Sequence, residues 1–334
     1  MCIRDRSVCI GPAPVADSYL QLDAILDAAE RTGADCIHPG YGFLSENQAF
    51  ASACEAKGIE FIGPPNAAIE VMGDKARAKR AMIDAGVPCV PGYQGDDQRV
   101  STLVAEAEKI GLPVMVKAAA GGGGRGMRLV HEVSELETAI DMAQSEAKNA
   151  FGSIELIIEK AVMRPRHVEI QVFADKAGNT VYIGERDCSI QRRHQKVVEE
   201  APCPVMTPEL REAMGKSAVE AAKAVNYVGA GTVEFLLDEA GEFYFLEMNT
   251  RLQVEHTITE EVIDYDLIKE QIKLAAGEKI TGRNHYPKLH SIQCRINAED
   301  PDRNFAPSPG RITDYHAPGG HGVRVDTHAY AGYM

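Results

Sequence analysis

The chain has 334 residues, 45% of them hydrophobic, which is enough for two or three domains with ordinary globular cores. Its 35 lysines and arginines against 49 aspartates and glutamates give a net charge of −14, which argues against a nucleic-acid-binding surface and requires local positive charge wherever an anion binds. The eight cysteines form no CxxC pair and the ten histidines show no paired ligand spacing, so neither a disulfide framework nor a zinc site is expected.

The amino-terminal segment, Met1–Ser7, lacks the apolar core of a signal peptide. No apolar run in the chain approaches the length of a membrane helix. We therefore predict a cytoplasmic protein with no membrane partner.

Residues 8–63 alternate between helical and strand-like patterns. Helical periodicity over 18–31 and 47–56 leads in each case into a strand-like run, at 34–38 and 59–62. This order predicts a parallel α/β domain. Two units are few for a parallel sheet, so we expect this domain to be incomplete at its amino end.

The loop at 38–47, with the sequence HPGYGFLSEN, follows the first predicted strand. Open parallel sheets place ligands at such strand ends, although a plain glycine and proline connection is an equal alternative. A helical linker at 64–86, with its helix capped near Asp74, leads out of this domain.

Region 87–161 holds a glycine-rich loop. A strand at 113–117 precedes the glycine run at 121–126, and a second strand follows at 127–130. The run matches GxGxxG, but the dinucleotide fingerprint requires a helix next, so we reject a Rossmann phosphate loop here.

A strand, glycine loop and strand instead predict a flap whose backbone N–H groups can approach phosphates, with Lys117 and Arg125 supplying charge. A mobile hairpin tip is the alternative interpretation. Lys75 is weaker evidence alone, because a lysine at the start of an amphipathic helix is usually just solvated.

Region 162–334 mixes strands with helices. Runs at 167–173 and 180–183 alternate as half-buried strands, and a charged segment follows at 185–196. Its cations could hold phosphate or another small anion, or could form a solvated face. Cys188 lies there without an identified base partner, so we interpret it as a buried structural thiol.

Two strand-like runs at 232–237 and 242–249 predict a hairpin. With a two-residue loop at Ala240–Gly241, Leu237 would pair with Tyr244.

In that register Glu234 lies opposite Glu247, on one face of the hairpin, whereas an odd-length loop would break the pair. Two carboxylates about 4 Å apart repel by about 4 kcal/mol at an effective dielectric of 20. A divalent cation would offset this, and Asn249 would add a third oxygen suited to Mg²⁺. A solvated acidic face is the alternative, but Arg251 and Glu255 follow at once.

The motifs occur in an order that resembles biotin carboxylase, of the ATP-grasp superfamily. The resemblance runs from about residue 8 to 333 and rests on CIGPAP at 9–14, HPGYGFLSEN at 38–47, RRHQKVVEEAP at 192–202, EMNTRLQVEH at 247–256 and CRINAEDP at 294–301. It implies a mixed α/β (α+β) ATP-grasp fold with a partial Rossmann-like N-terminal domain at 8–63, the helical linker at 64–86, a small glycine-loop lid domain at 87–161 and an incomplete C-terminal domain at 162–334.

The resemblance also implies roles for individual residues. Nucleotide-contacting positions are Lys75, Lys117, Gly123, Gly124, Glu159, Lys160, Val162, His167, Gln191 and His194, together with Glu234, Glu247 and Val254. The ligands of Mg²⁺ (or Mn²⁺) are Glu234, Glu247 and Asn249, the bicarbonate site is Lys196, Arg251 and Val254, the general base is Glu255, and the cation that stabilises the biotin enolate is Arg295.

The implied reaction is a ligase reaction in two steps. Glu255 deprotonates bicarbonate for attack on the γ-phosphate of ATP, which gives carboxyphosphate. The released phosphate then takes the proton of the biotin ureido nitrogen while Arg295 binds the ureido oxygen. Closure of the glycine-loop lid would exclude water.

The resemblance further implies partners, because the sequence contains no Met-Lys-Met biotin acceptor. We expect a biotin carboxyl carrier protein, a carboxyltransferase as in acetyl-CoA and other acyl-CoA carboxylases, and a homodimer in the intact family member. The chain lacks the start of the family's first domain and stops within its last one, so it resembles a fragment truncated at both ends. The alternatives are an ATP-binding fragment without turnover and another ATP-grasp ligase.

Overall fold

The computed structural model describes residues 6–120, 127–280 and 284–334. The first region contains a short 3₁₀ helix, η1 (Val15–Asp17), and two helix–strand units. These are α1 (Leu22–Thr32) with β1 (Cys36–Ile37) and α2 (Gln48–Ala56) with β2 (Glu60–Phe61). The two strands pair in parallel, which confirms the predicted α/β pattern.

The linker forms two helices, α3 (Asn66–Met72) and α4 (Lys75–Asp84). The Asp74 side chain accepts a hydrogen bond from the backbone N–H of Arg77, so the predicted helix cap is confirmed.

The next region is a four-stranded antiparallel sheet, in the order β3-β6-β4-β5, covered by α5 (Val100–Ile110) and α6 (Val133–Phe151). The strands are β3 (Gly92–Tyr93), β4 (Val114–Ala118), β5 (Met127–Val130) and β6 (Leu156–Lys160). The glycine run at 121–126 lies outside the described residues, but the element after it is the strand β5. Because a strand and not a helix comes next, the prediction that this is not a Rossmann phosphate loop is confirmed.

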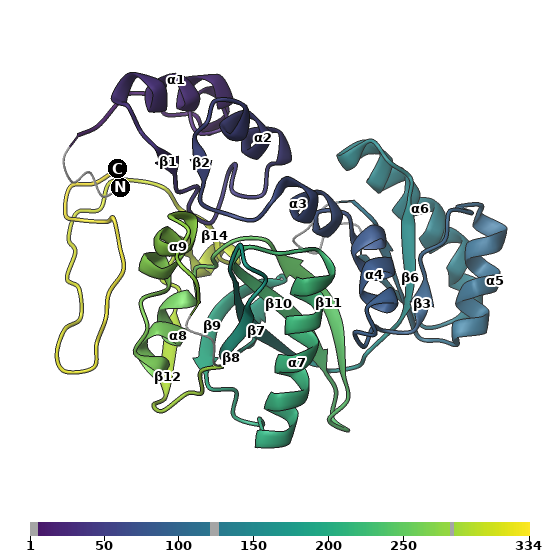
Figure 1. The fold of residues 1–334 in the computed structure, drawn as a ribbon. Coiled ribbons are helices and arrows are strands. Elements are labelled where there is room, and N and C mark those ends of the chain that lie inside the picture. The colour runs from purple at the N-terminus through teal and green to yellow at the C-terminus, as the bar shows by residue number, and fades with distance from the viewer. Residues whose placement is uncertain (1–5, 121–126, 281–283) are drawn as a thin grey trace.

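The centre of the molecule is a six-stranded antiparallel sheet in the order β11-β10-β7-β8-β9-β12 (Figure 1). Its strands are β7 (Arg166–Ala174), β8 (Thr180–Arg192), β9 (Gln195–Ala201), β10 (Gly229–Leu237), β11 (Phe243–Asn249) and β12 (Ser291–Cys294). The predicted strand at 180–183 extends nine residues further, because pairing with β7 and β9 continues into the charged segment.

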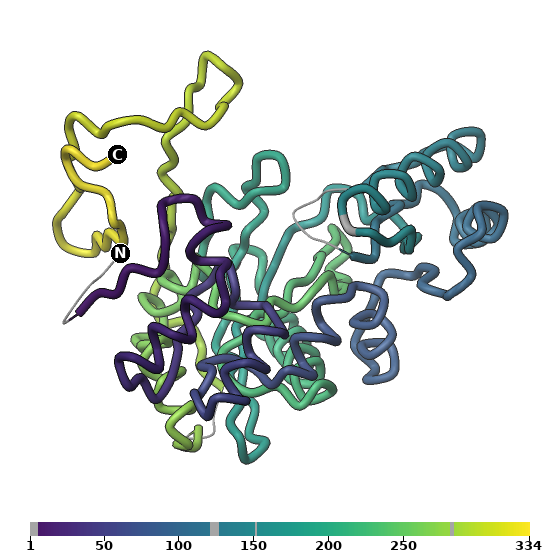
Figure 2. Tube along the Cα trace, turned by 90° about the horizontal axis from the view of Figure 1, so that it is seen from above, coloured from purple at the N-terminus to yellow at the C-terminus, as the bar shows by residue number. Residues whose placement is uncertain are grey.

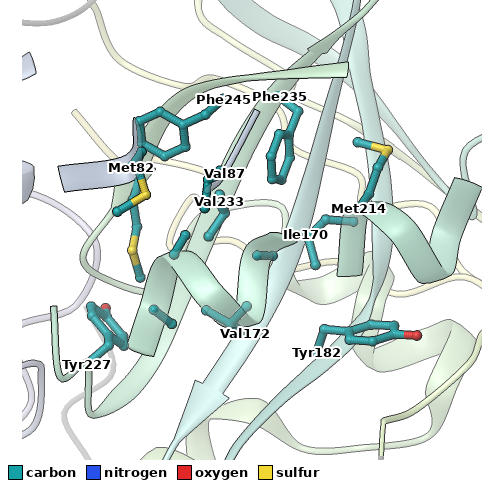
Figure 3. Packing of buried hydrophobic residues seen from close by; sticks show 14 of the residues in the cluster. Met82, Val87, Ile170, Val172, Tyr182, Met214, Tyr227, Val233, Phe235 and Phe245 are labelled. Carbon is teal, nitrogen blue, oxygen red and sulfur yellow. The ribbon is translucent and has the colours of Figure 1, made fainter. Parts of the chain in front are cut away.

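The two faces of this sheet are covered by different helices. Helix α7 (Pro208–Ala224) packs on one face, whereas α8 (His256–Ile263) and α9 (Leu267–Ala275) pack on the other. Figure 3 shows the first interface, where Val233 and Phe235 of β10 lie beside Ile170 of β7 and Met214 of α7.

Alternation along the strands decides what each face carries. Residues 168, 170, 172 and 174 of β7 belong to the apolar core under α7. Phe173 instead joins the core under α8 and α9, and the buried polar residues Glu169 and Gln171 share its parity. The polar side chains of β7 therefore lie on the α8 side of the sheet.

The β10–β11 hairpin differs from the prediction in its loop and not at its acidic pair. Leu237 pairs with Phe243 rather than Tyr244, so the loop has an odd number of residues. A β-bulge between the Phe235–Phe245 and Glu234–Glu247 pairs then restores the register, with Leu246 as the extra residue. The predicted Leu237–Tyr244 pair is wrong, and the predicted Glu234–Glu247 pair is confirmed.

The last part of the chain, drawn in yellow, projects from the rest of the molecule (Figure 2). It contains the short strands β13 (Glu299–Asp300) and β14 (Ala306–Pro307), with η2 (Pro301–Arg303) between them. Arg192 of β8 pairs with Glu299 and lies over the ring of Phe305, which joins this segment to the central sheet. Within the described ranges, no helix combines the length and apolarity needed to cross a bilayer.

Candidate active site

A row of charged residues crosses the central sheet on the α8 side. Glu247 of β11 is the register partner of Glu234 of β10, Glu234 is that of Glu169 of β7, and Glu169 is that of Arg186 of β8. Glu234, Glu169 and Arg186 are buried, and the guanidinium of Arg186 binds Glu169. We call these four residues the charged row.

Lys196 of β9 lies at the centre of this face. Its Nζ donates to Glu169, to Glu234 at 2.9 Å and to Glu255 at 2.7 Å. Burial alone would lower the pKa of Lys196, but the surrounding carboxylates, led by Glu169 and Glu234, raise it above its usual value. One ammonium group thus offsets part of the negative charge of three acidic side chains.

The two buried acidic members of the row, Glu234 and Glu169, are held ionised. Burial would raise the pKa of Glu234, but Lys196 and His167 hold it well below its usual range. Burial would also raise the pKa of Glu169, but Arg186 and Lys196 lower it. His167 lies 2.9 Å from Glu234, so that burial, which lowers the pKa of His167, is overcome by the carboxylate, which raises it.

Glu255 stands at the N-cap of α8, 2% exposed, between two cations. Its Oε1 accepts from Lys196, and its Oε2 accepts from Nη2 of Arg295 at 2.8 Å. Arg295 is itself held through Nε by the buried Glu199, at 2.6 Å. The predicted base and the predicted enolate-binding cation are therefore in direct contact.

The three predicted metal ligands lie together at the β11 end of the charged row. The amide of Asn249 donates to Glu234 at 2.9 Å, and Glu247 pairs with Lys75 of α4 at 2.8 Å. Hard oxygen donors from two adjacent strands suit Mg²⁺. Among the described residues, a second group of metal-type donors, His167, Glu169 and Glu234, lies within 4.8 Å of one another.

Arg251 and Val254 follow in the turn between β11 and α8. Arg251 donates from Nη2 to Asn249 at 2.9 Å, from Nη1 to the carbonyl of Leu252 at 3.2 Å and from Nε to Glu46 at 2.8 Å. Val254 is half-buried beside Glu255.

Two of the predicted nucleotide contacts in the small sheet, Lys117 of β4 and Glu159 of β6, lie together. Lys117 and Lys79 of α4 both bind the carboxylate of Glu159, and burial, which would raise its pKa, is overcome by these two cations, which lower it to about 2. Lys160 turns away, because its Nζ donates to the carbonyls of Gly111 and Leu112.

Val162 and the backbone of Lys160 lie at the connection between the two sheets. A cavity of about 430 Å³ opens there, lined on one side by this connection and on the other by the tip of the β10–β11 hairpin, including Asp238 and Tyr244. Lys160 and Val162 both line this cavity, and their contact with a nucleotide stays a prediction.

The remaining predicted residues are Gln191, His194, Gly123 and Gly124. Gln191 lies against His167, with Nε2 3.2 Å from Nδ1, next to Glu234. His194 instead lies exposed in the β8–β9 turn, at φ 62°. Gly123 and Gly124 lie outside the described residues.

Glu169, Arg186 and Gln253 were not predicted from the sequence, but as a hydrogen-bonded group they contact the predicted residues on this face. Arg186 is fully buried and donates to Gln171, Thr259, Thr232 and Gln253 as well as to Glu169. Gln253 in turn donates to Glu234 at 2.8 Å. The available signal was the alternation His167, Glu169, Gln171 along a strand whose other face is apolar.

Comparisons with known proteins agree with this geometry. Residues 74–283 match the model of the carbamoyl-phosphate synthase L chain ATP-binding domain, and residues 2–69 and 293–334 match the biotin carboxylase N-terminal and C-terminal domains. The chain belongs to the biotin carboxylase family. The predicted resemblance and the ATP-grasp α/β fold are confirmed.

Known biotin carboxylases are similar to this chain over nearly its whole length. The chloroplastic biotin carboxylase of Arabidopsis thaliana is 55% identical over 99% of the chain, and the chain spans 62% of that relative's length.

Two solved structures are also similar. The biotin carboxylase of Campylobacter jejuni, a complex with β,γ-ATP, has a TM-score of 0.94 at 49% identity, over 97% of this chain and 73% of that one. The biotin carboxylase domain of Hydrogenobacter thermophilus 2-oxoglutarate carboxylase, with MgADP and bicarbonate, has a TM-score of 0.92 at 51% identity, over 97% and 72%.

Proposed function

We propose that this chain is the part of a biotin carboxylase that carries the chemistry: it uses ATP and bicarbonate to carboxylate biotin on a carrier protein, by way of carboxyphosphate. The observation that carries the proposal is the position of Glu255. Its carboxylate lies between Lys196 and Arg295, and Lys196 also pairs with Glu234, one of the proposed metal ligands.

The nucleotide would lie between the two sheets, with Lys117 and Lys75 toward its phosphates and the backbone of Lys160 and Val162 toward its base. Glu234, Glu247 and Asn249 would hold Mg²⁺, because two facing carboxylates need a cation beyond Lys75 and Lys196 when an anionic phosphate approaches. When bound, the ion would neutralise the charge that develops on the transferred phosphoryl group. In support, the Hydrogenobacter thermophilus structure contains MgADP and bicarbonate.

Bicarbonate would lie near Arg251, Lys196 and the backbone of Val254. Glu255 removes its proton, and the neighbouring cations hold the resulting dianion for attack on the γ-phosphate. The two N–H donors of Arg251 that its protein contacts do not use are free to bind the anion.

Biotin would then be activated beside Arg295. The ureido oxygen gains negative charge when the nitrogen loses its proton, and a guanidinium held by both Glu199 and Glu255 is fixed in position to stabilise that charge. The carrier protein, the carboxyltransferase and a homodimer are parts of the same proposal, as are the predicted domain boundaries and a cytoplasmic location.

The test is ADP release by the purified protein with Mg-ATP and bicarbonate, with and without free biotin. We expect release that depends on bicarbonate and is stimulated by biotin, and a loss of about 10² to 10⁴-fold in Glu255→Gln. Glu261→Gln, on the exposed side of the same helix, is the matched control and should retain activity.

Biotin-independent turnover with another acceptor would favour a different ATP-grasp ligase. Cooperative unfolding and Mg-ATP binding without turnover would favour a binding fragment.

A further inference from the structure

The loop HPGYGFLSEN, between β1 and α2, reaches the active site through Glu46. The Oε1 atom of Glu46 accepts from the backbone N–H of Thr250 at 3.0 Å and from its hydroxyl at 3.3 Å. Its Oε2 atom accepts from Nε of Arg251 at 2.8 Å. One carboxylate of the first region therefore accepts hydrogen bonds from two consecutive residues of the EMNTRLQVEH segment.

The loop is braced on both sides of Glu46. Leu44 and Ser45 are buried, and the side chain of Asn47 accepts from the N–H of Phe50, which caps α2. At the start of the loop, His38 bonds Gln271 of α9 at 3.0 Å. Because the backbone is tied to its own helix and to α9, the position of the Glu46 carboxylate is set by the fold.

This contact determines how Arg251 can present its charge. The contacts of Arg251 with Glu46, Asn249 and Leu252 involve Nε, Nη2 and Nη1 in turn. Rotation of the guanidinium about its stem is thereby prevented, and two of its five N–H donors remain for an anion. A guanidinium that is ordered before its ligand arrives loses less conformational entropy on binding.

We propose that Glu46 is a positioning residue for the bicarbonate site: it orients Arg251 and does not touch the substrate. The inference rests on the proposed function, because it assigns bicarbonate to Arg251. The side chain of Glu46 is 40% exposed and that of Arg251 is 21% exposed, so the pair adds little to stability, and its effect is on geometry.

The test is steady-state kinetics of Glu46→Gln with bicarbonate and ATP varied separately. The amide can serve either Thr250 or Arg251 with its single oxygen, so we expect KM for bicarbonate to rise about 10-fold, the effect of about one charge-assisted hydrogen bond. KM for ATP should stay within about twofold. Glu70→Gln, which removes a comparable exposed carboxylate from Arg77 in the same part of the chain, is the control and should change neither constant.

A double-mutant cycle separates positioning from a general structural effect. If Glu46 acts through Arg251, Glu46→Gln should have no further effect in an Arg251→Ala background. Equal effects in both backgrounds, or parallel increases in both KM values, would overturn the proposal.

Calorimetric titration of bicarbonate in the presence of MgADP distinguishes this inference from the proposed function. If the wild type binds bicarbonate but does not turn over, the proposed function fails, and weaker binding by Glu46→Gln still supports the positioning role. Equal binding by the two proteins contradicts the positioning role alone. Absence of bicarbonate binding to the wild type overturns both.

Discussion

The two faces of strands β7 and β10 are built from alternate residues of the same segments. One face is apolar and the other is charged. On the α7 side, Val168, Val233 and Phe235 pack in an apolar core, where a fully buried large apolar side chain contributes about 1.5–3 kcal/mol. On the α8 side, Glu169 and Glu234 lie buried next to each other and need Lys196 and Arg186 to offset their repulsion.

Buried charges of this kind rarely add net stability, since each must be removed from water. Their cost in stability, one residue away from an apolar core, supports the proposal that they are there for chemistry. The pleat of the strand allows an apolar face and a charged face together, because residues that are adjacent in sequence point to opposite sides of the sheet.

Truncation on the apolar side should give the largest change in stability. Phe235→Ala removes a fully buried ring that packs edge-on against Phe243, so the free energy of unfolding in urea should fall by about 3–5 kcal/mol. Met142→Ala, at a half-exposed position of α6, is the control and should cost less than about 1 kcal/mol. A loss at Phe235 as small as the control's would contradict the assignment of this face to stability.

Glu159 lies outside the charged row, and its contribution to stability should depend on pH. The pKa of Glu159 falls from 4.5 to about 2, because Lys117 and Lys79 outweigh the effect of burial. Since the folded-state pKa is depressed, its contribution of about 3 kcal/mol is fully present above pH 4.5 and is lost as the pH falls toward 2.

The measurement is the free energy of unfolding of the wild type and of Glu159→Gln across that window, as far as both remain folded. The gap between the two proteins should narrow as the pH falls. Parallel curves would show that Glu159 is not held ionised by its lysines.

Cys188 should give the smallest effect. Its thiol is fully buried, and burial, followed by the charge of Glu169, raises its pKa well above the usual value, so it stays protonated. We expect Cys188→Ala to cost about 1 kcal/mol in stability and to change bicarbonate-dependent ADP release less than twofold. A tenfold loss of turnover in a stable protein would give Cys188 a chemical role.

Local patterns were enough to predict the elements beside the motifs, but not helices α5 to α9. The strands around the glycine run, the cap at Asp74 and the parallel pair β1 and β2 follow from periodicity and capping residues alone. The hairpin register was harder, because two deviations cancel: an odd loop shifts Leu237 onto Phe243, and the bulge at Leu246 shifts Glu234 back onto Glu247. Loop length and bulges depend on tertiary packing that a local pattern does not contain.

The candidate site divides in the same way. Glu234, Glu247 and Glu255 could be found because they lie within one motif and its partner strand. The alternation that marks Glu169 was present in the sequence, but its contacts with Arg186 and Lys196 join three strands. The contact between Glu46 and Arg251 joins residues that are 205 positions apart, so it depends on how the first region docks on the central sheet.

We expect one face of the sheet to stabilise the protein and the other to bind Mg-ATP. The most direct test is the free energy of unfolding with and without Mg-ATP for the wild type, Phe235→Leu and Glu247→Gln. Binding at 100 times Kd should stabilise the wild type by about 2.7 kcal/mol.

Phe235→Leu should be less stable in both conditions and keep that increment. Glu247→Gln, whose half-exposed carboxylate pairs with Lys75, should resemble the wild type without ligand and lose most of the increment. If both variants lost stability and the increment together, the division between the two faces would be contradicted.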